Sequence, residues 1–111
     1  MSSGKLQNKI AIITGASSGL GRAIAVRYAK EGARIVCADL VPTARAAVQE
    51  EAQPTHELLT EKYGAHAAIY VKCDVASEED IKSVVDKAVE WGGRLDIMVN
   101  NAGIPTLINI E

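Results

Sequence analysis

The chain has 111 residues, 48% of them hydrophobic and 23% charged, and a formal net charge of -2. This length and composition are typical of one globular domain, which we assign to residues 1–111. The small net charge predicts no nucleic-acid partner, and no apolar run reaches the roughly 20 residues that a membrane span needs. The start, MSSGKLQNK, lacks the apolar stretch of a secretory signal, and Cys37 and Cys73 stand alone in apolar runs. We therefore expect a cytoplasmic protein whose cysteines are buried thiols.

Extended and helical patterns alternate in the first part of the chain. The short apolar run over residues 9–14 predicts a strand that is buried on both faces. Residues 20–31 predict a helix, with Leu20 on its apolar side and Arg22 on its polar side. The run ARIVCAD predicts a second strand, which ends at Asp39.

Residues 40–66 have two helical halves with Pro54 between them. Proline breaks the hydrogen-bond ladder of a helix interior, so we predict two short helices, or one sharply kinked helix, divided near Gln53 and Pro54. A third strand is expected over residues 67–75.

The clearest helix signal begins at Ser77, which together with Asp80 resembles a capping box. Apolar residues at helical spacing then predict one buried face. Its members are Ile81, Val84, Val85, Ala88 and Val89. Gly92 and Gly93 are expected to end this helix, and residues 95–99 predict a fourth strand.

This alternation predicts an α/β fold, a Rossmann-like doubly wound parallel sheet with helices on both faces. Such sheets bind ligands beyond the carboxyl ends of their strands, all of which lie at one edge. A polar or glycine-rich cluster follows each predicted strand. The clusters are TGASSGLG, Asp39, Asp74 and NNAG.

TGASSGLG, at residues 14–21, joins the first strand to the first helix. Gly15 allows a tight turn, while Gly19 and Gly21 keep Cβ atoms away from an approaching ligand and from the neighbouring strand. Backbone amides at the helix N-terminus, with the helix dipole behind them, favour a pyrophosphate. Ser17 and Ser18 add hydroxyl donors.

Asp39 closes the second strand, where dinucleotide-binding folds place an acid that accepts hydrogen bonds from the adenosine ribose. A carboxylate there repels a 2′-phosphate, so it predicts NAD as the cofactor, with NADP disfavoured. Asp74 can approach the adenine amino group while Val75 packs on the ring. Alternatively, these two residues form only a turn before a capped helix. NNAG can close the cleft while its side chains bond neighbouring backbone.

Taken together, the four clusters resemble the short-chain dehydrogenase/reductase family over about residues 8–103, with four strands of the usual seven. The resemblance implies that the glycine loop holds the cofactor pyrophosphate and adenosine, and that NNAG steadies the sheet beside the nicotinamide ribose. The cofactor-binding residues are then Gly15, Ser17, Ser18, Gly19, Leu20, Gly21, Asp39, Asp74, Val75, Asn101, Ala102 and Gly103.

In that family a hydride passes between nicotinamide and an alcohol or carbonyl carbon, assisted by a tyrosine, a lysine four residues later, a serine and an asparagine. Tyr28, Tyr63 and Tyr70 all precede NNAG, and none is followed by a lysine at that spacing. We therefore assign no catalytic residue. His56 and His66 are isolated from other ligand types, so we assign no metal site either.

The resemblance implies the N-terminal, cofactor-binding part of an oxidoreductase, either truncated or incomplete. The alternative is a non-catalytic nucleotide-binding or interaction module, whose fourth strand would offer an edge to a partner. A nucleotide-sugar or methyl-donor enzyme is disfavoured by NNAG and by the glycine spacing. Homo-oligomers are usual in the family, but the elements that form their interface are missing from this sequence.

Overall fold

The computed structural model describes residues 4–43 and 53–101. The elements follow one another as β1 (Ile10–Thr14), α1 (Gly19–Lys30), β2 (Arg34–Asp39), α2 (Thr55–Tyr63), β3 (Ala68–Lys72), α3 (Glu78–Gly92) and β4 (Ile97–Val99). The strands form one parallel sheet in the order β3-β2-β1-β4. The predicted α/β fold with a parallel sheet is therefore confirmed.

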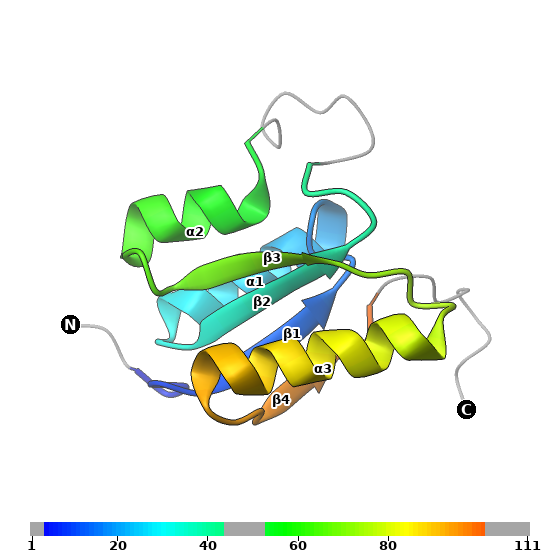
Figure 1. Ribbon diagram of the computed structural model, residues 1–111. Helices are drawn as coiled ribbons and strands as arrows, with labels where there is room; N and C mark the ends of the chain where they lie inside the picture. The colour runs from blue at the N-terminus through cyan, green and yellow to red at the C-terminus, as the bar shows by residue number, and fades with distance from the viewer. Residues whose placement is uncertain (1–3, 44–52, 102–111) are drawn as a thin grey trace, which may run out of the picture.

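Helices cover the sheet on both faces, with α3 in front of it and α1 behind it in Figure 1. The central strand β1 is buried throughout its length, as its nearly continuous apolar run predicts. Because successive side chains of a strand point to opposite faces, Ile10 and Ile12 pack under α3, whereas Ala11 and Ile13 pack on the side of α1 and α2.

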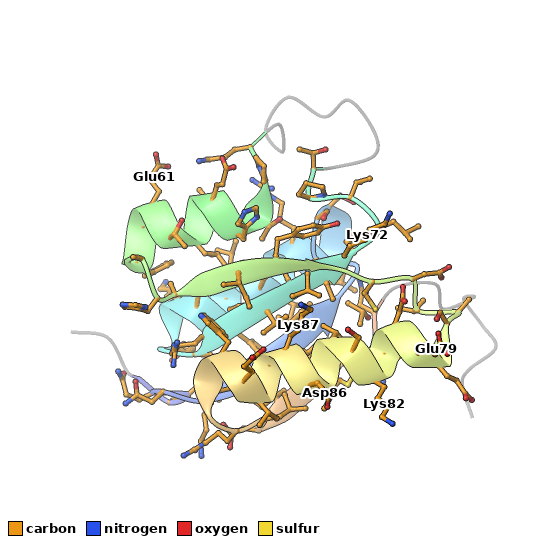
Figure 2. The ribbon with its side chains drawn as sticks, viewed as in Figure 1. Glu61, Lys72, Glu79, Lys82, Asp86 and Lys87 are labelled. Atoms are coloured by element: carbon orange, nitrogen blue, oxygen red, sulfur yellow. The ribbon has the colours of Figure 1, made fainter. Side chains whose placement is uncertain are left out.

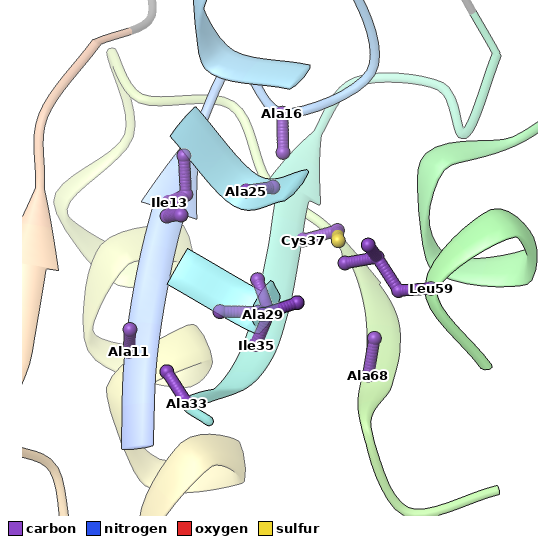
Figure 3. Close-up of a cluster of buried hydrophobic side chains, with 10 residues drawn as sticks. All are labelled: Ala11, Ile13, Ala16, Ala25, Ala29, Ala33, Ile35, Cys37, Leu59 and Ala68. Carbon is purple, nitrogen blue, oxygen red and sulfur yellow. The ribbon is translucent and has the colours of Figure 1, made fainter. Parts of the chain in front are cut away.

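Small residues line the face that α1 covers. Ala25 and Ala29 of α1 meet Ile13 and Ile35 of the sheet, and Leu59 joins the same cluster from α2 (Figure 3). Alanine side chains let the helix approach the strands closely, so the first helix is held firmly beside the carboxyl end of β1.

The sides predicted for Leu20 and Arg22 in the first turn of α1 are wrong. Arg22 is only 7% exposed, whereas Leu20 is 67% exposed. The buried positions of α1 run through Gly21, Arg22, Ala25 and Ala29. Arg22 can occupy this face because its guanidinium finds hydrogen-bond acceptors there, at the carbonyl of Gln53 and the hydroxyl of Thr55.

Helix α3 begins as its capping signal predicts, since the hydroxyl of Ser77 accepts a hydrogen bond from the amide of Asp80 at 3.1 Å. Val84 and Ala88 are fully buried against the sheet. Val89, predicted on the same face, lies at its margin and is 44% exposed, so that assignment is wrong. The opposite side of α3 carries exposed charges such as Lys82 (Figure 2).

The predicted start of a helix after Pro54 is confirmed, because α2 begins at Thr55. The helix that we predict before Pro54 falls largely on residues 44–52, which lie outside the described residues. Cys37 and Cys73 are both free thiols and both 1% exposed, as predicted. Burial raises the pKa of the Cys37 thiol to about 12.

Candidate functional site

The glycine loop leaves the end of β1 and turns into α1 at the carboxyl edge of the sheet. Gly15 and Gly19 have positive φ values of 67° and 57°, a conformation that favours glycine. The amide of Gly15 donates a hydrogen bond of 2.8 Å to the carbonyl of Ala38 in β2. The loop is therefore tied to the neighbouring strand before the helix begins.

Gly19 and Gly21 meet different surroundings, which the sequence did not separate. A Cβ on Gly21 would lie 2.0 Å from the carbonyl oxygen of Gly15 and 2.8 Å from Nδ2 of Asn101. A Cβ on Gly19 would meet no atom within 4 Å. Gly21 therefore permits the close approach of loop, helix and β4, whereas Gly19 leaves open space above the loop.

The first turn of α1 suits an anion. It contains no acidic residue, while Arg27 and Lys30 lie in the last turn. The first amides of a helix have no intrahelical acceptor, and the helix dipole makes that end positive. Ser18 is the N-cap residue, and its side chain makes no capping hydrogen bond. This end of α1 can bind a phosphate through backbone amides.

Asp39 lies beside the glycine loop and is only 8% exposed. Its Oδ2 accepts a hydrogen bond from the amide of Ser17 at 3.0 Å, and its Oδ1 accepts one from the amide of Leu40 at 2.7 Å. The hydroxyl of Ser17 in turn donates to the carbonyl of Val41. The sequence placed Asp39 at this edge but did not reveal that its carboxylate also holds the loop.

The end of β3 reaches the same region through Tyr70 and Cys73. The hydroxyl of Tyr70 donates to the carbonyl of Asp39 at 3.0 Å, and the amide of Cys73 donates to the same carbonyl at 2.9 Å. Burial, followed by the nearby charge of Asp39, raises the pKa of Tyr70 above its ordinary value of 10.0. These bonds place the backbone of Asp39 firmly at the strand end.

Asp74 takes part in the turn that the sequence offered as an alternative. Its Oδ1 accepts a hydrogen bond from the amide of Ala76, and its amide donates to Oδ2 of Asp80, both at 2.9 Å. Its side chain is exposed, while Val75 packs partly against the α3 side of the core. A contact of these two residues with adenine stays a prediction.

Asn101 is joined to the strand that precedes the glycine loop. Its amide donates to the hydroxyl of Thr14 at 2.8 Å, and that hydroxyl donates to the carbonyl of Val99 at 3.2 Å. The end of β4 is thereby fixed to the end of β1, 87 residues away in the chain. Ala102 and Gly103 lie outside the described residues.

Sequence reasoning missed Thr55, which contacts the loop, and the burial of Arg22, which contacts Thr55. Thr55 donates its hydroxyl proton to the carbonyl of Ala16 at 2.7 Å, and Nη1 of Arg22 donates to Thr55 Oγ1 at 3.1 Å. The only sequence signal for Thr55 was its place directly after Pro54, at a helix start. Nothing in the helical pattern indicated that Arg22 points inward.

Three comparisons place this arrangement among known proteins. A family model described as short chain dehydrogenase matches residues 9–111. The chain is 42% identical over 100 residues to short chain aldehyde dehydrogenase 1 of Euphorbia lathyris, covering 90% of this chain and 31% of that protein. It is also 42% identical over 100 residues to momilactone A synthase of Oryza sativa subsp. japonica, again covering 90% of this chain and 32% of that protein.

Solved structures agree. The crystal structure of a hydroxysteroid dehydrogenase from Escherichia coli superposes with a TM-score of 0.73 at 32% identity, over 93% of this chain and 40% of that one. A short chain dehydrogenase from Mycobacterium smegmatis gives 0.72 at 34% identity, over 91% of this chain and 38% of that one. The chain thus spans about a third of the length of the curated relatives it matches. None of the helices within the described residues is long and apolar enough to cross a membrane.

Proposed function

Because this chain belongs to the short chain dehydrogenase family, we propose that it is the dinucleotide-binding part of an oxidoreductase that acts on alcohol or carbonyl substrates. The observation that carries the proposal is the open N-terminus of α1. There a side chain on Gly19 would meet no atom within 4 Å, and Asp39 lies at the same sheet edge. Such an edge suits a ligand with a pyrophosphate and a ribose.

The residues divide the binding task among them. Backbone amides at the N-terminus of α1 would hold the pyrophosphate, because the helix dipole makes that end positive and its first turn carries no acidic residue. Asp39 would accept hydrogen bonds from the adenosine ribose. Asn101, fixed by Thr14, would line the cleft toward the nicotinamide ribose.

When bound, the nicotinamide ring would supply the hydride acceptor or donor. Since no tyrosine of this sequence is followed by a lysine four residues later, the role proposed for the described residues is to bind and orient the cofactor. Asp74 and Val75 would meet the adenine ring from the end of β3. No contact among the described residues favours the alternative of a non-catalytic interaction module.

We propose NAD as the preferred cofactor, on the basis of Asp39. Asp39 would accept hydrogen bonds from the ribose hydroxyls in addition to those it accepts from the amides of Ser17 and Leu40. A 2′-phosphate at that place would meet a like charge, which is costly at a site only 8% exposed to solvent.

The preference is tested by titrating the chain with NADH and NADPH. Charge-assisted bonds to the ribose are each worth about 1.5–3 kcal/mol, which corresponds to roughly a 10- to 150-fold tighter binding of NADH. Asp39→Asn is expected to weaken the binding of both cofactors, because the amide of Ser17 or Leu40 loses its acceptor. It is also expected to bring the affinities for NADH and NADPH closer together. The ratio is therefore the informative quantity, and equal affinities in the unmutated chain would refute the role of Asp39.

We also propose a cytoplasmic location, as expected from the sequence. It is supported by Cys37 and Cys73, which are free and buried, as is common in a reducing compartment. A homo-oligomer is proposed only by analogy with the family.

A further inference from the structure

The peptide group between Ala16 and Ser17 is held at both of its polar atoms. Its carbonyl oxygen accepts a hydrogen bond of 2.7 Å from Thr55 Oγ1, at the start of α2. Its amide donates one of 3.0 Å to Oδ2 of Asp39, at the end of β2. Rotation of this peptide plane would break both bonds, so two elements that are distant in the sequence together set its orientation.

The donor and the acceptor in each hydrogen bond at the hydroxyl of Thr55 follow from the groups involved. A threonine hydroxyl has one proton, and the carbonyl of Ala16 can only accept, so the proton of Thr55 is committed to Ala16. Arginine can only donate, and Nη1 of Arg22 accordingly donates to Thr55 Oγ1 at 3.1 Å and to the carbonyl of Gln53 at 2.6 Å. Arg22 thereby fixes the rotamer of Thr55 and polarises its hydroxyl.

Burial strengthens this chain of bonds. Thr55 is 1% exposed and Arg22 is 7% exposed, so water cannot readily replace either partner. A buried carbonyl or guanidinium without its partner is costly, which makes the arrangement sensitive to the loss of one hydroxyl group. Neither residue is needed at the surface for this role, and the open space at Gly19 is where the proposed function places the ligand.

We propose that Thr55, oriented by Arg22, is a positioning residue that holds the glycine loop in its nucleotide-binding conformation and couples nucleotide binding to the start of α2. The inference rests on the proposed function, since it takes the loop to be the pyrophosphate site. If the loop is already ordered, binding does not lose the conformational entropy of ordering it. By reciprocity, the bound ligand stabilises the hydrogen bonds that Thr55 makes to the loop and to Arg22. Helix α2 then responds to the cofactor through the hydrogen bond from Thr55 to Ala16.

Two variants and a matched control test the binding half of the proposal. Thr55→Val keeps the shape of the side chain but removes its hydroxyl, and it is expected to weaken NADH binding by about 5- to 20-fold, the loss of one or two net hydrogen bonds. Thr55→Ser keeps the hydroxyl and should bind NADH within about twofold of the unmutated chain. Thr60→Val removes a hydroxyl that, among residues 4–43 and 53–101, donates to the carbonyl of Glu57 within α2, and it should leave NADH binding unchanged.

Hydrogen exchange tests the coupling half, first in the unmutated chain and then in the two Thr55 variants. NADH should slow amide exchange over residues 55–63, and this protection should be absent in Thr55→Val and restored in Thr55→Ser. A purely structural role for Thr55 would lower stability without removing ligand-dependent protection. Unchanged exchange in α2 when NADH is bound overturns the inference and leaves the proposed function intact, whereas a chain that binds no NADH overturns both.

Discussion

Replacing Gly21 with alanine would place a methyl carbon 2.0 Å from the carbonyl oxygen of Gly15 and 2.7 Å from its carbonyl carbon. Both of these are backbone atoms, so neither can move aside by a change of rotamer. Overpacking costs about 1–3 kcal/mol, and a clash with rigid backbone belongs at the upper end of that range. Alanine recovers about 1 kcal/mol through its better helix propensity. We therefore expect Gly21→Ala to lower the free energy of unfolding by about 2 kcal/mol or more.

Gly19→Ala is the matched comparison, because a Cβ at this position meets no atom within 4 Å. The methyl group has room, but the φ of 57° is strained for alanine and costs about 1–2 kcal/mol. Reduced freedom of the unfolded chain returns about 0.4–1 kcal/mol, which leaves a loss of about 1.6 kcal/mol or less. The methyl group would, however, occupy the space proposed for the pyrophosphate, so NADH binding should fall by more than about tenfold.

Urea unfolding, followed by circular dichroism and by Trp91 fluorescence, measures the free energy of unfolding of each variant. NADH titration of each folded variant measures its affinity for the cofactor. The two substitutions should have different effects. Gly21→Ala should be the less stable variant, and Gly19→Ala should be more stable but bind NADH poorly. Equal stability of the two variants would contradict the packing argument for Gly21. Unchanged NADH binding by Gly19→Ala would show that this glycine does not face the ligand.

Three further outcomes are expected. Ser77→Ala removes the N-cap of α3 and should cost about 1 kcal/mol in urea unfolding, whereas the exposed Ser83→Ala should cost nothing, and equal losses would count against the cap. Because burial raises the pKa of Cys37 to about 12, its thiol should resist iodoacetamide at pH 8 until the chain is unfolded, and rapid labelling of the folded chain would contradict this burial. The hydrogen bond from Arg94 lowers the pKa of Asp96 below its ordinary 3.8, so its stabilising effect is complete above that pH and is lost as the pH falls through the lower folded-state pKa. Thermal unfolding at pH 6 and pH 3 should then show a smaller acid-induced loss for Asp96→Asn than for the unmutated chain, and an equal loss would refute the assignment.

Much of the fold could be predicted from local patterns alone. The apolar run before TGASSGLG predicts the central strand, Pro54 predicts a helix boundary, and Ser77 with Asp80 predicts the start of α3. Each of these signals acts within a few residues, through burial period, proline geometry or a cap. The sheet edge at which Asp39 lies could also be predicted, because the carboxyl ends of parallel strands all lie at the same edge.

The side of α1 that is buried could not be predicted in the same way. Helical spacing divides residues into two faces, but it does not say which polar side chain will find partners inside. Arg22 is buried because Gln53 and Thr55 accept hydrogen bonds from its guanidinium, whereas Leu20, predicted on the apolar side, lies at the surface. An apolar pattern measures average preference, and specific hydrogen bonds to another helix outweigh that preference at one position.

The sequence by itself determined the order of the elements, the parallel sheet and the glycine loop with an acid at the same edge. Only the tertiary structure decided that Gly21 is required by packing while Gly19 is open, and that Asp39 also holds the loop. The same holds for the peptide between Ala16 and Ser17, whose two bonds span 39 and 22 residues of chain. Local patterns reflect forces between residues close in sequence, whereas these contacts exist only once the folded sheet brings distant segments within hydrogen-bonding distance.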